Sequence, residues 1–276
     1  MQLALEDNVE DVLGKAQRGL GLSDEDICKD TGLSAAQWQA LLAGEPLTDE
    51  LRKAAAPLQL KAGPLIALAE KRYQPAEHRV EGLLCFNTPY PIPGYEEMTV
   101  NAYLAYDPET KEAVAFDTGG DATPMVDAIQ AHGLDLKLIL ITHADSDHIA
   151  DLPRLKRETD EPPTFTDYNE PVEGAEPVGE GAFFSVGGLG ILAAETSGHS
   201  PGQLSYIIQG LSKPVAVVGD SLFAGSIGGA PNAWKEAIEN CRKKLLSLDP
   251  QTILCPGHGP LTSVAEEVVN NPILAA

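Results

Sequence analysis

Histidine and aspartate residues crowd one short stretch of this sequence. His143, Asp145, Asp147 and His148 fall within six residues, and imidazole and carboxylate groups are common protein ligands of divalent cations. Packing them so tightly is costly unless a cation offsets the repulsion between the carboxylates. The alternative is a polar turn in which an aspartate caps a helix. The spacing favours a metal site.

More candidate ligands follow in turns farther along the chain. His199 and His258 lie in Gly-rich and Pro-rich turns, and Asp220 ends the apolar run 215–219. Each comes just after a predicted strand, where open α/β sheets place their ligand sites. The predicted metal ligands are therefore His143, Asp145, Asp147, His148, His199, Asp220 and His258.

Strands and helices must bring these groups together. Residues 137–141 form a short apolar run with branched side chains, typical of a strand buried on both faces. Further strands are predicted at 79–86, 99–106, 112–116, 164–166, 182–186, 190–195, 203–208, 215–218 and 252–255. Helices are predicted from 123 to 132, after His148 to about 157, from 232 to 247 and from 261 to 270. The Pro-rich loop 87–98 is either a substrate entrance or a surface connection.

Residues 1–75 are predicted to be entirely helical. Helices are expected at 6–20, from Ser23, at 34–43, from Thr48 and from Pro64, on the basis of caps and apolar spacing. The two short helices on either side of Thr31-Gly32 resemble the helix-turn-helix of repressor-type domains. Pro75 marks a boundary, so we expect a helical domain at 1–75 and a second domain at 76–276. His78 and His132 are interpreted as surface residues.

The helix at 34–43 has little of the chemistry that DNA recognition needs. It carries Gln37 and Gln39 but no Lys or Arg, and acidic residues outnumber basic ones in residues 1–75. Contacts to bases and phosphates depend on basic side chains. We therefore expect the helical region to serve in packing, as a lid or in dimerisation, so a homodimer is possible.

Composition limits the classes of partner. The chain has 276 residues, 43% of them hydrophobic, and a formal net charge of −22. Such an acidic surface disfavours nucleic acids and anionic membranes, which leaves a small-molecule substrate. No apolar run approaches the length of about 18 residues that a membrane span needs. The four scattered cysteines and the absence of a visible secretory signal predict a cytoplasmic protein with reduced thiols.

The order of these motifs resembles that of a known family. The chain resembles the metallo-β-lactamase superfamily in the order of its motifs. These are Phe116-Asp-Thr-Gly-Gly120, then H-x-D-x-D-H, G-H-S, G-D-S and P-G-H-G-P. Gly219-Asp-Ser-Leu-Phe-Ala-Gly-Ser-Ile-Gly228 is similar to the glyoxalase II (hydroxyacylglutathione hydrolase) branch. The resemblance runs from about residue 80 to the end. It implies an α/β fold, the αβ/βα sandwich of the superfamily, here preceded by a small all-α domain.

The resemblance also implies how the ligands divide between two divalent metal ions. His143, residue 145 and His199 would hold one ion, Asp220 would bridge, and the second ion would be held by Asp147, His148 and His258. The implied activity is that of a hydrolase in which a metal-bound hydroxide attacks a thioester carbonyl. Asp147 would act as the catalytic residue that helps to orient this nucleophile.

Two departures from the glyoxalase II pattern leave other functions open. Asp145 stands where that branch has a histidine, and a carboxylate shifts the metal preference from zinc toward iron or manganese. Gly229-Ala-Pro231 follows the Ser-Ile-Gly run, so glutathione recognition is not supported by the residues. The alternatives are a phosphodiesterase, a lactonase, an iron-dependent persulfide oxygenase, or a non-catalytic metal-binding regulatory protein.

Overall fold

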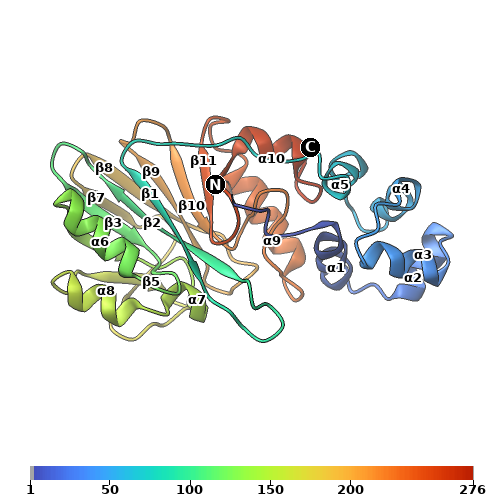
Figure 1. The fold of residues 1–276 in the computed structure, drawn as a ribbon, viewed down its shortest axis with the longest axis horizontal. Helices are drawn as coiled ribbons and strands as arrows, with labels where there is room; N and C mark the ends of the chain where they lie inside the picture. The colour runs from blue at the N-terminus through green and yellow to red at the C-terminus, as the bar shows by residue number, and fades with distance from the viewer. Residues whose placement is uncertain (1–2, 276) are drawn as a thin grey trace.

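Two six-stranded sheets stack face to face in the computed structural model, which describes residues 3–275 (Figure 1). The first sheet has the order β1 (Leu83–Pro89), β2 (Thr99–Tyr106), β3 (Glu112–Phe116), β4 (Asp135–Leu140), β5 (Thr164–Asp167) and β6 (Glu176–Val178). The second has the order β12 (Thr262–Ser263), β11 (Ile253–Pro256), β10 (Val215–Gly219), β9 (Leu204–Gln209), β8 (Leu189–Glu195) and β7 (Phe183–Val186).

The parallel part of the first sheet places its loops at one edge. Strands β3 to β6 are parallel, whereas β1, β2 and β3 pair antiparallel. A parallel pair needs a crossover, so α6 (Thr123–His132) connects β3 to β4, and α7 (Ser146–Ile149) and α8 (Leu152–Glu158) connect β4 to β5. The carboxyl ends of β3 and β4, where Asp117 and His143 follow, therefore lie side by side.

Alternating side chains build two cores around the first sheet. Along β2, Tyr103 points into the core between the sheets, and Leu104 points to the opposite face, beneath α6 and α8. Tyr206 and Val217 of the second sheet enter the same central core as Tyr103. The predicted α/β sandwich is confirmed.

The amino-terminal helices gather at one end of the molecule (Figure 1). They are α1 (Val9–Leu20), α2 (Asp24–Thr31), α3 (Ala35–Leu42), α4 (Thr48–Ala55) and α5 (Ala62–Ala69). Capping boxes open α2 at Ser23 and α3 at Ser34, as predicted. No helix within residues 3–275 is both long enough and apolar enough to cross a bilayer.

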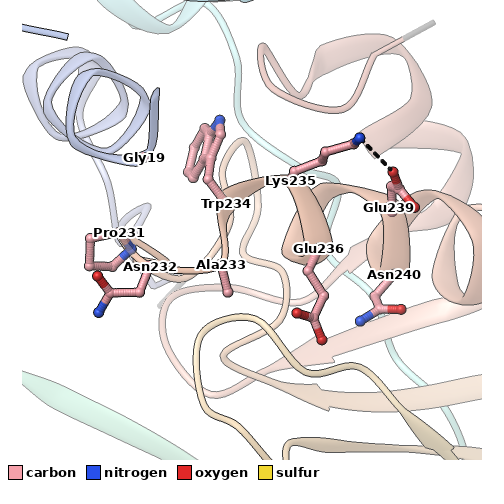
Figure 2. A pocket seen from close by; sticks show the side chains of 9 residues that line it. All are labelled: Gly19, Pro231, Asn232, Ala233, Trp234, Lys235, Glu236, Glu239 and Asn240. Carbon is pink, nitrogen blue, oxygen red and sulfur yellow. Dashed lines mark ion pairs between the residues drawn. The ribbon is translucent and has the colours of Figure 1, made fainter. Parts of the chain in front are cut away.

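A shared core joins these helices to the second sheet. Leu13 and Trp38 belong to the same buried cluster as Val218 of β10 and as Trp234 of α9 (Trp234–Asn240), which continues into a π-helical turn, η1 (Cys241–Leu245). At the contact between α1 and α9, a Cβ atom on Gly19 would lie 2.4 Å from a ring carbon of Trp234 (Figure 2). The domain boundary after residue 75 stays a prediction.

Several details differ from the sequence predictions, among them one helix, one strand and one histidine. The helix expected at 232–247 becomes π-helical after Asn240, and the closing helix, α10 (Val264–Asn270), follows a short strand that was not predicted. His78 is not a surface residue, because its Nε2 lies 2.7 Å from a carboxylate oxygen of Glu266 on α10 and its side chain is only 12% exposed. That partner is distant in sequence, so local pattern could not reveal it.

Candidate metal centre

The loops after β4, β8, β10 and β11 bring the predicted ligands to one place. Two groups of three residues have potential ligand atoms that all lie within 4.8 Å of one another. The first group is His143, His199 and Asp220; the second is Asp147, His148 and His258. Five of the six are buried, His199 being half-buried. This grouping parallels the division implied by the family resemblance, and the ligand roles themselves stay a prediction.

Asp220 faces both groups. Its Oδ1 lies 3.3 Å from His148 Nε2, whereas its Oδ2 lies 3.4 Å from His258 Nε2 and 3.7 Å from His199 Nε2. Its position at the end of β10 follows from the buried run Val215–Gly219, which fixes the strand, and from the turn that begins there. Both oxygens thus approach histidines of the second group, and Oδ2 also approaches His199 of the first group, so this carboxylate lies where a bridging ligand would stand.

Asp145 stands at the rim of the centre. Its side chain is 54% exposed, and its Oδ2 lies 3.3 Å from His199 Nε2 and 3.6 Å from His143 Nε2. The imidazoles of His143 and His199 beside it hold the pKa of the Asp145 carboxyl far below its usual range. Asp145 therefore lies within reach of the first group but outside its tight set of three.

Backbone carbonyls set the orientation of two imidazoles. His199 Nδ1 donates to Gly229 O at 3.0 Å, and His258 Nδ1 donates to Thr99 O at 2.7 Å. Because a carbonyl oxygen only accepts, each Nδ1 must carry the hydrogen, and the Nε2 lone pair is directed into the centre. Such outer hydrogen bonds are the usual support of metal-binding histidines.

Asp117 performs the same task for the other two histidines. Its Oδ2 accepts from His148 Nδ1 and from Thr142 Oγ1, both at 2.8 Å. Since the Thr142 hydroxyl gives its one hydrogen to Asp117, it must accept from His143 Nδ1, 3.0 Å away. The buried Asp117 thus fixes both imidazoles, with a backbone φ of 58°.

Asp117 lies in the motif Phe116-Asp-Thr-Gly-Gly120, from which no role for it was predicted. Its partners Thr142 and His148 follow β4 and come beside it only through the parallel pairing of β3 with β4. An aspartate at the end of a strand that precedes the ligand strand is the signal that could have identified it.

Buried atoms without partners indicate what the centre would hold. Within residues 3–275, His143 Nε2, His148 Nε2 and Asp220 Oδ1 are buried and make no hydrogen bond. Leaving such atoms unpaired costs about 1–3 kcal/mol each. Burial alone would lower the pKa of His148, yet the negative charges of Asp220 and Asp117 outweigh it and raise the pKa to about 10. Imidazole and carboxylate atoms in this arrangement fit divalent cations.

A cavity of about 490 Å³ opens over the centre. Its walls include Tyr90, Ile92 and Met98 of the loop 87–98, which supports the reading of this loop as an entrance. Glu6 and Lys15 of the amino-terminal region also line it. A second cavity, of about 510 Å³, lies where α1 meets α9 and contains none of the predicted ligands (Figure 2).

Comparison with curated proteins finds related hydrolases. The chain is 29% identical over 209 residues to hydroxyacylglutathione hydrolase GloC of Haemophilus influenzae, a match that covers 67% of this chain and 95% of the relative. It is 32% identical over 140 residues to hydroxyacylglutathione hydrolase of Aliivibrio fischeri, covering 50% of this chain and 54% of the relative. The chain thus spans nearly all of the first relative and about half of the second.

Solved structures show the same architecture. BLEG-1 B3 metallo-beta-lactamase matches with a TM-score of 0.60 and 28% identity over 70% of this chain and 100% of that chain. ETHE1 from Myxococcus xanthus matches with a TM-score of 0.55 and 26% identity, over 64% of this chain and 80% of that chain. TTHA1623 in a di-iron-bound form matches with a TM-score of 0.52 and 26% identity, over 67% of this chain and 100% of that chain.

The family model that matches describes the residues that carry the site. It is the model of the metallo-beta-lactamase superfamily, and it covers residues 95–258. This range begins in the loop before β2 and ends at His258, so it includes all seven predicted ligands and Asp117. With sequence, fold and site in agreement, this chain belongs to the metallo-beta-lactamase superfamily.

Proposed function

We propose that this metallo-hydrolase cleaves a thioester with water, giving a carboxylic acid and a free thiol. The observation that carries the proposal is the pair of three-residue groups with Asp220 between them. The similarity to hydroxyacylglutathione hydrolase GloC over nearly all of that relative's length supports the choice of a thioester.

The residues of the centre have separable tasks. Two divalent cations, once bound, would lower the pKa of water and polarise the thioester carbonyl. The four imidazoles would hold them through Nε2, and Asp117 and the backbone carbonyls keep these imidazoles aligned. Asp147 Oδ2, which lies 3.3 Å from His258 Nε2, would orient the attacking water. The side chains of Ile92, Met98 and Phe223 in the cavity wall would limit the access of bulk solvent.

The residues near the cavity bear on which thiol the thioester carries. After the Ser-Ile-Gly run the chain has Gly229-Ala-Pro231 and no basic residue there. Instead, Glu6 and Lys15 of the amino-terminal region line the cavity. The proposed substrate class is therefore an acyl thioester, without commitment to glutathione.

A second candidate function is iron-dependent oxygenation of a persulfide. Asp145 favours it, because a carboxylate beside His143 and His199 makes the first group harder and more suited to iron. The likenesses to ETHE1 and to a di-iron-bound protein fit this alternative.

The experiment is thiol release from a panel of acyl thioesters by metal-loaded protein, followed with a thiol-reactive dye. Release should vanish on chelation and fall at least about 100-fold in Asp147→Ala, the scale of losing a positioned catalytic group. Asp127→Ala, an exposed aspartate on α6, is the matched control and should keep the wild-type rate. Fully loaded protein that releases no thiol but consumes oxygen with a persulfide would favour the second candidate.

A further inference from the structure

The amino-terminal segment before α1 lies against the metal centre. A Cβ atom on Gly259, the residue after His258, would come within 3.0 Å of Glu6 N and 3.4 Å of Ala4 O. The next residue, Asp7, is buried and accepts from Ser226 Oγ at 2.5 Å. The segment is thus fixed to the turn that carries His258 and to the loop that follows Asp220.

Lys15 of α1 reaches the same place, but its charge is already balanced. Its Nζ lies 2.5 Å from Asp7 Oδ2 and donates to Ile227 O at 3.0 Å, and its side chain is only 13% exposed. It also lies 5.0 Å from the centre of the Phe223 ring. A buried and paired ammonium offers little attraction to an anionic substrate.

Glu6 is different, because its carboxylate feels the charges of Lys15 and His258 only at a distance. It is exposed and lines the cavity, and within residues 3–275 its carboxylate makes no hydrogen bond or ion pair. The four aspartates of the centre, Asp117, Asp145, Asp147 and Asp220, would balance the charge of two divalent cations. Glu6 is therefore left as an uncompensated negative charge on the cavity wall, with the ring of Tyr90 also in the lining.

We infer that Glu6 is a specificity-determining residue that favours thioesters whose thiol part carries an ammonium group. This inference rests on the proposed function. In a hydroxyacylglutathione the thiol part is the larger one, so it is the part that would extend along the cavity wall. A carboxylate and an aromatic ring are the groups that attract an ammonium ion, and the same carboxylate repels anionic carriers.

The test uses three acetyl thioesters that differ in charge and little else. They are acetylthiocholine, its neutral analogue S-(3,3-dimethylbutyl) thioacetate, and S-acetyl-2-mercaptoethanesulfonate as the anion. The metal-loaded wild-type chain should prefer the cation over the neutral analogue by about tenfold in kcat/KM, with the anion poorest. In Glu6→Gln this ratio should fall to near one, and Glu6→Lys should reverse it.

Glu25→Gln provides the matched control, because it removes the same charge from an exposed position on α2. It should keep the wild-type ratio. A wild-type preference for the anion, or a cation preference that survives Glu6→Gln, would overturn the inference.

A binding measurement separates this inference from the proposed function. If no thioester is hydrolysed by fully loaded protein, the thioester function fails, and calorimetric titration with thiocholine and 3,3-dimethylbutanethiol still tests Glu6. Tighter binding of thiocholine that Glu6→Gln abolishes would support the inference, and equal binding of the two thiols would contradict it.

Discussion

At the scale of single residues, the centre depends on where four imidazole hydrogens lie. His199 and His258 donate from Nδ1 to backbone carbonyls, and His143 and His148 are fixed through Asp117, directly or by way of Thr142. All four Nε2 atoms are therefore available to cations. One carboxylate that belongs to neither group, that of Asp117, thus controls two of the four imidazoles.

We expect Asp117→Asn to lower metal affinity about 10- to 100-fold, the usual effect of losing such a partner. Asparagine tolerates the positive φ of this position, so the backbone should be preserved. However, the neutral amide of asparagine lacks the negative charge that strengthens the hydrogen bonds from His148 and Thr142. Competition with a chromogenic chelator measures the affinity.

Asp121→Asn is the control for this change, since Asp121 lies in the same loop with a 51% exposed side chain. It should leave metal affinity unchanged. Equal affinities of the two variants would show that Asp117 has no positioning role.

Position 145 should select the metal. With a carboxylate there, protein purified without added metal is expected to contain iron, whereas Asp145→His should contain zinc, because imidazole suits zinc better. Elemental analysis of the two preparations decides this. Zinc in both would mean that His143 and His199 set the preference without help from Asp145.

The residue types in the sequence were enough to predict where the site lies, but not which residues outside the predicted ligands surround it. Residues of the motif 143–148 are neighbours along the chain, and His199, Asp220 and His258 follow strands, so their convergence could be predicted. Asp117 reaches its partners across a parallel strand pair, and Glu6 lines the cavity from the other end of the chain. The spacing within the motif 143–148 does not reveal such long-range contacts.

At the scale of elements, the helical region and the sandwich are held together by close packing. Gly19 of α1 lies against the Trp234 ring of α9, and α9 in turn supports the turn that carries His199. Glu236 accepts from Ser197 Oγ at 2.6 Å, and Asn240 donates to Ser197 O at 2.8 Å. The helix α9 thus connects α1 to a predicted metal ligand.

Gly19→Ala should therefore destabilise the protein by about 1–3 kcal/mol, the usual cost of forcing an atom into a packed contact. The added Cβ would overlap the indole ring at 2.4 Å (Figure 2). The free energy of unfolding, measured with denaturant, gives the effect.

Gly14→Ala on the same helix is the matched control. Its Cβ would meet mainly the flexible end of Arg18, and alanine favours a helix over glycine by about 0.5–1 kcal/mol, so this variant should be slightly more stable. If Gly19→Ala were as stable as Gly14→Ala, the contact between α1 and α9 would not have the close packing described above.

The elements of the sandwich were predictable where apolar runs and caps were strong. Strand β10 and helix α3 lie within one residue of their predicted bounds, and helix α2 begins within one residue of its predicted start. The π-helical turn after Asn240 and the short strands β6 and β12 were missed, because tertiary packing sets them.

The helix-turn-helix resemblance stays a prediction, and the side chains argue against base reading. Gln37 donates to Glu50 and Gln39 to Asp24, so both amides are already engaged with carboxylates.

At the scale of the whole molecule, the amino-terminal helices share a core with the second sheet, and Lys15 of α1 and Glu6 before it line the cavity over the centre. With a net charge of −22, the surface provides little attraction for polyanions. Both facts favour a role for the helices in the substrate site over one in nucleic-acid binding. The fold class could be predicted from the motifs. The packing of the amino-terminal helices against the second sheet could not, because it depends on contacts between residues far apart in the sequence.

The measurement that tests the central claim most directly is metal content per chain in the wild type and in Asp220→Ala. Because Asp220 faces both groups, the account predicts about two equivalents of divalent metal in the wild type and a loss from both groups in the variant. Thiol release should disappear together with the metal. A wild-type chain that takes up no metal from excess, or an Asp220→Ala variant that keeps both equivalents and full activity, would contradict the account.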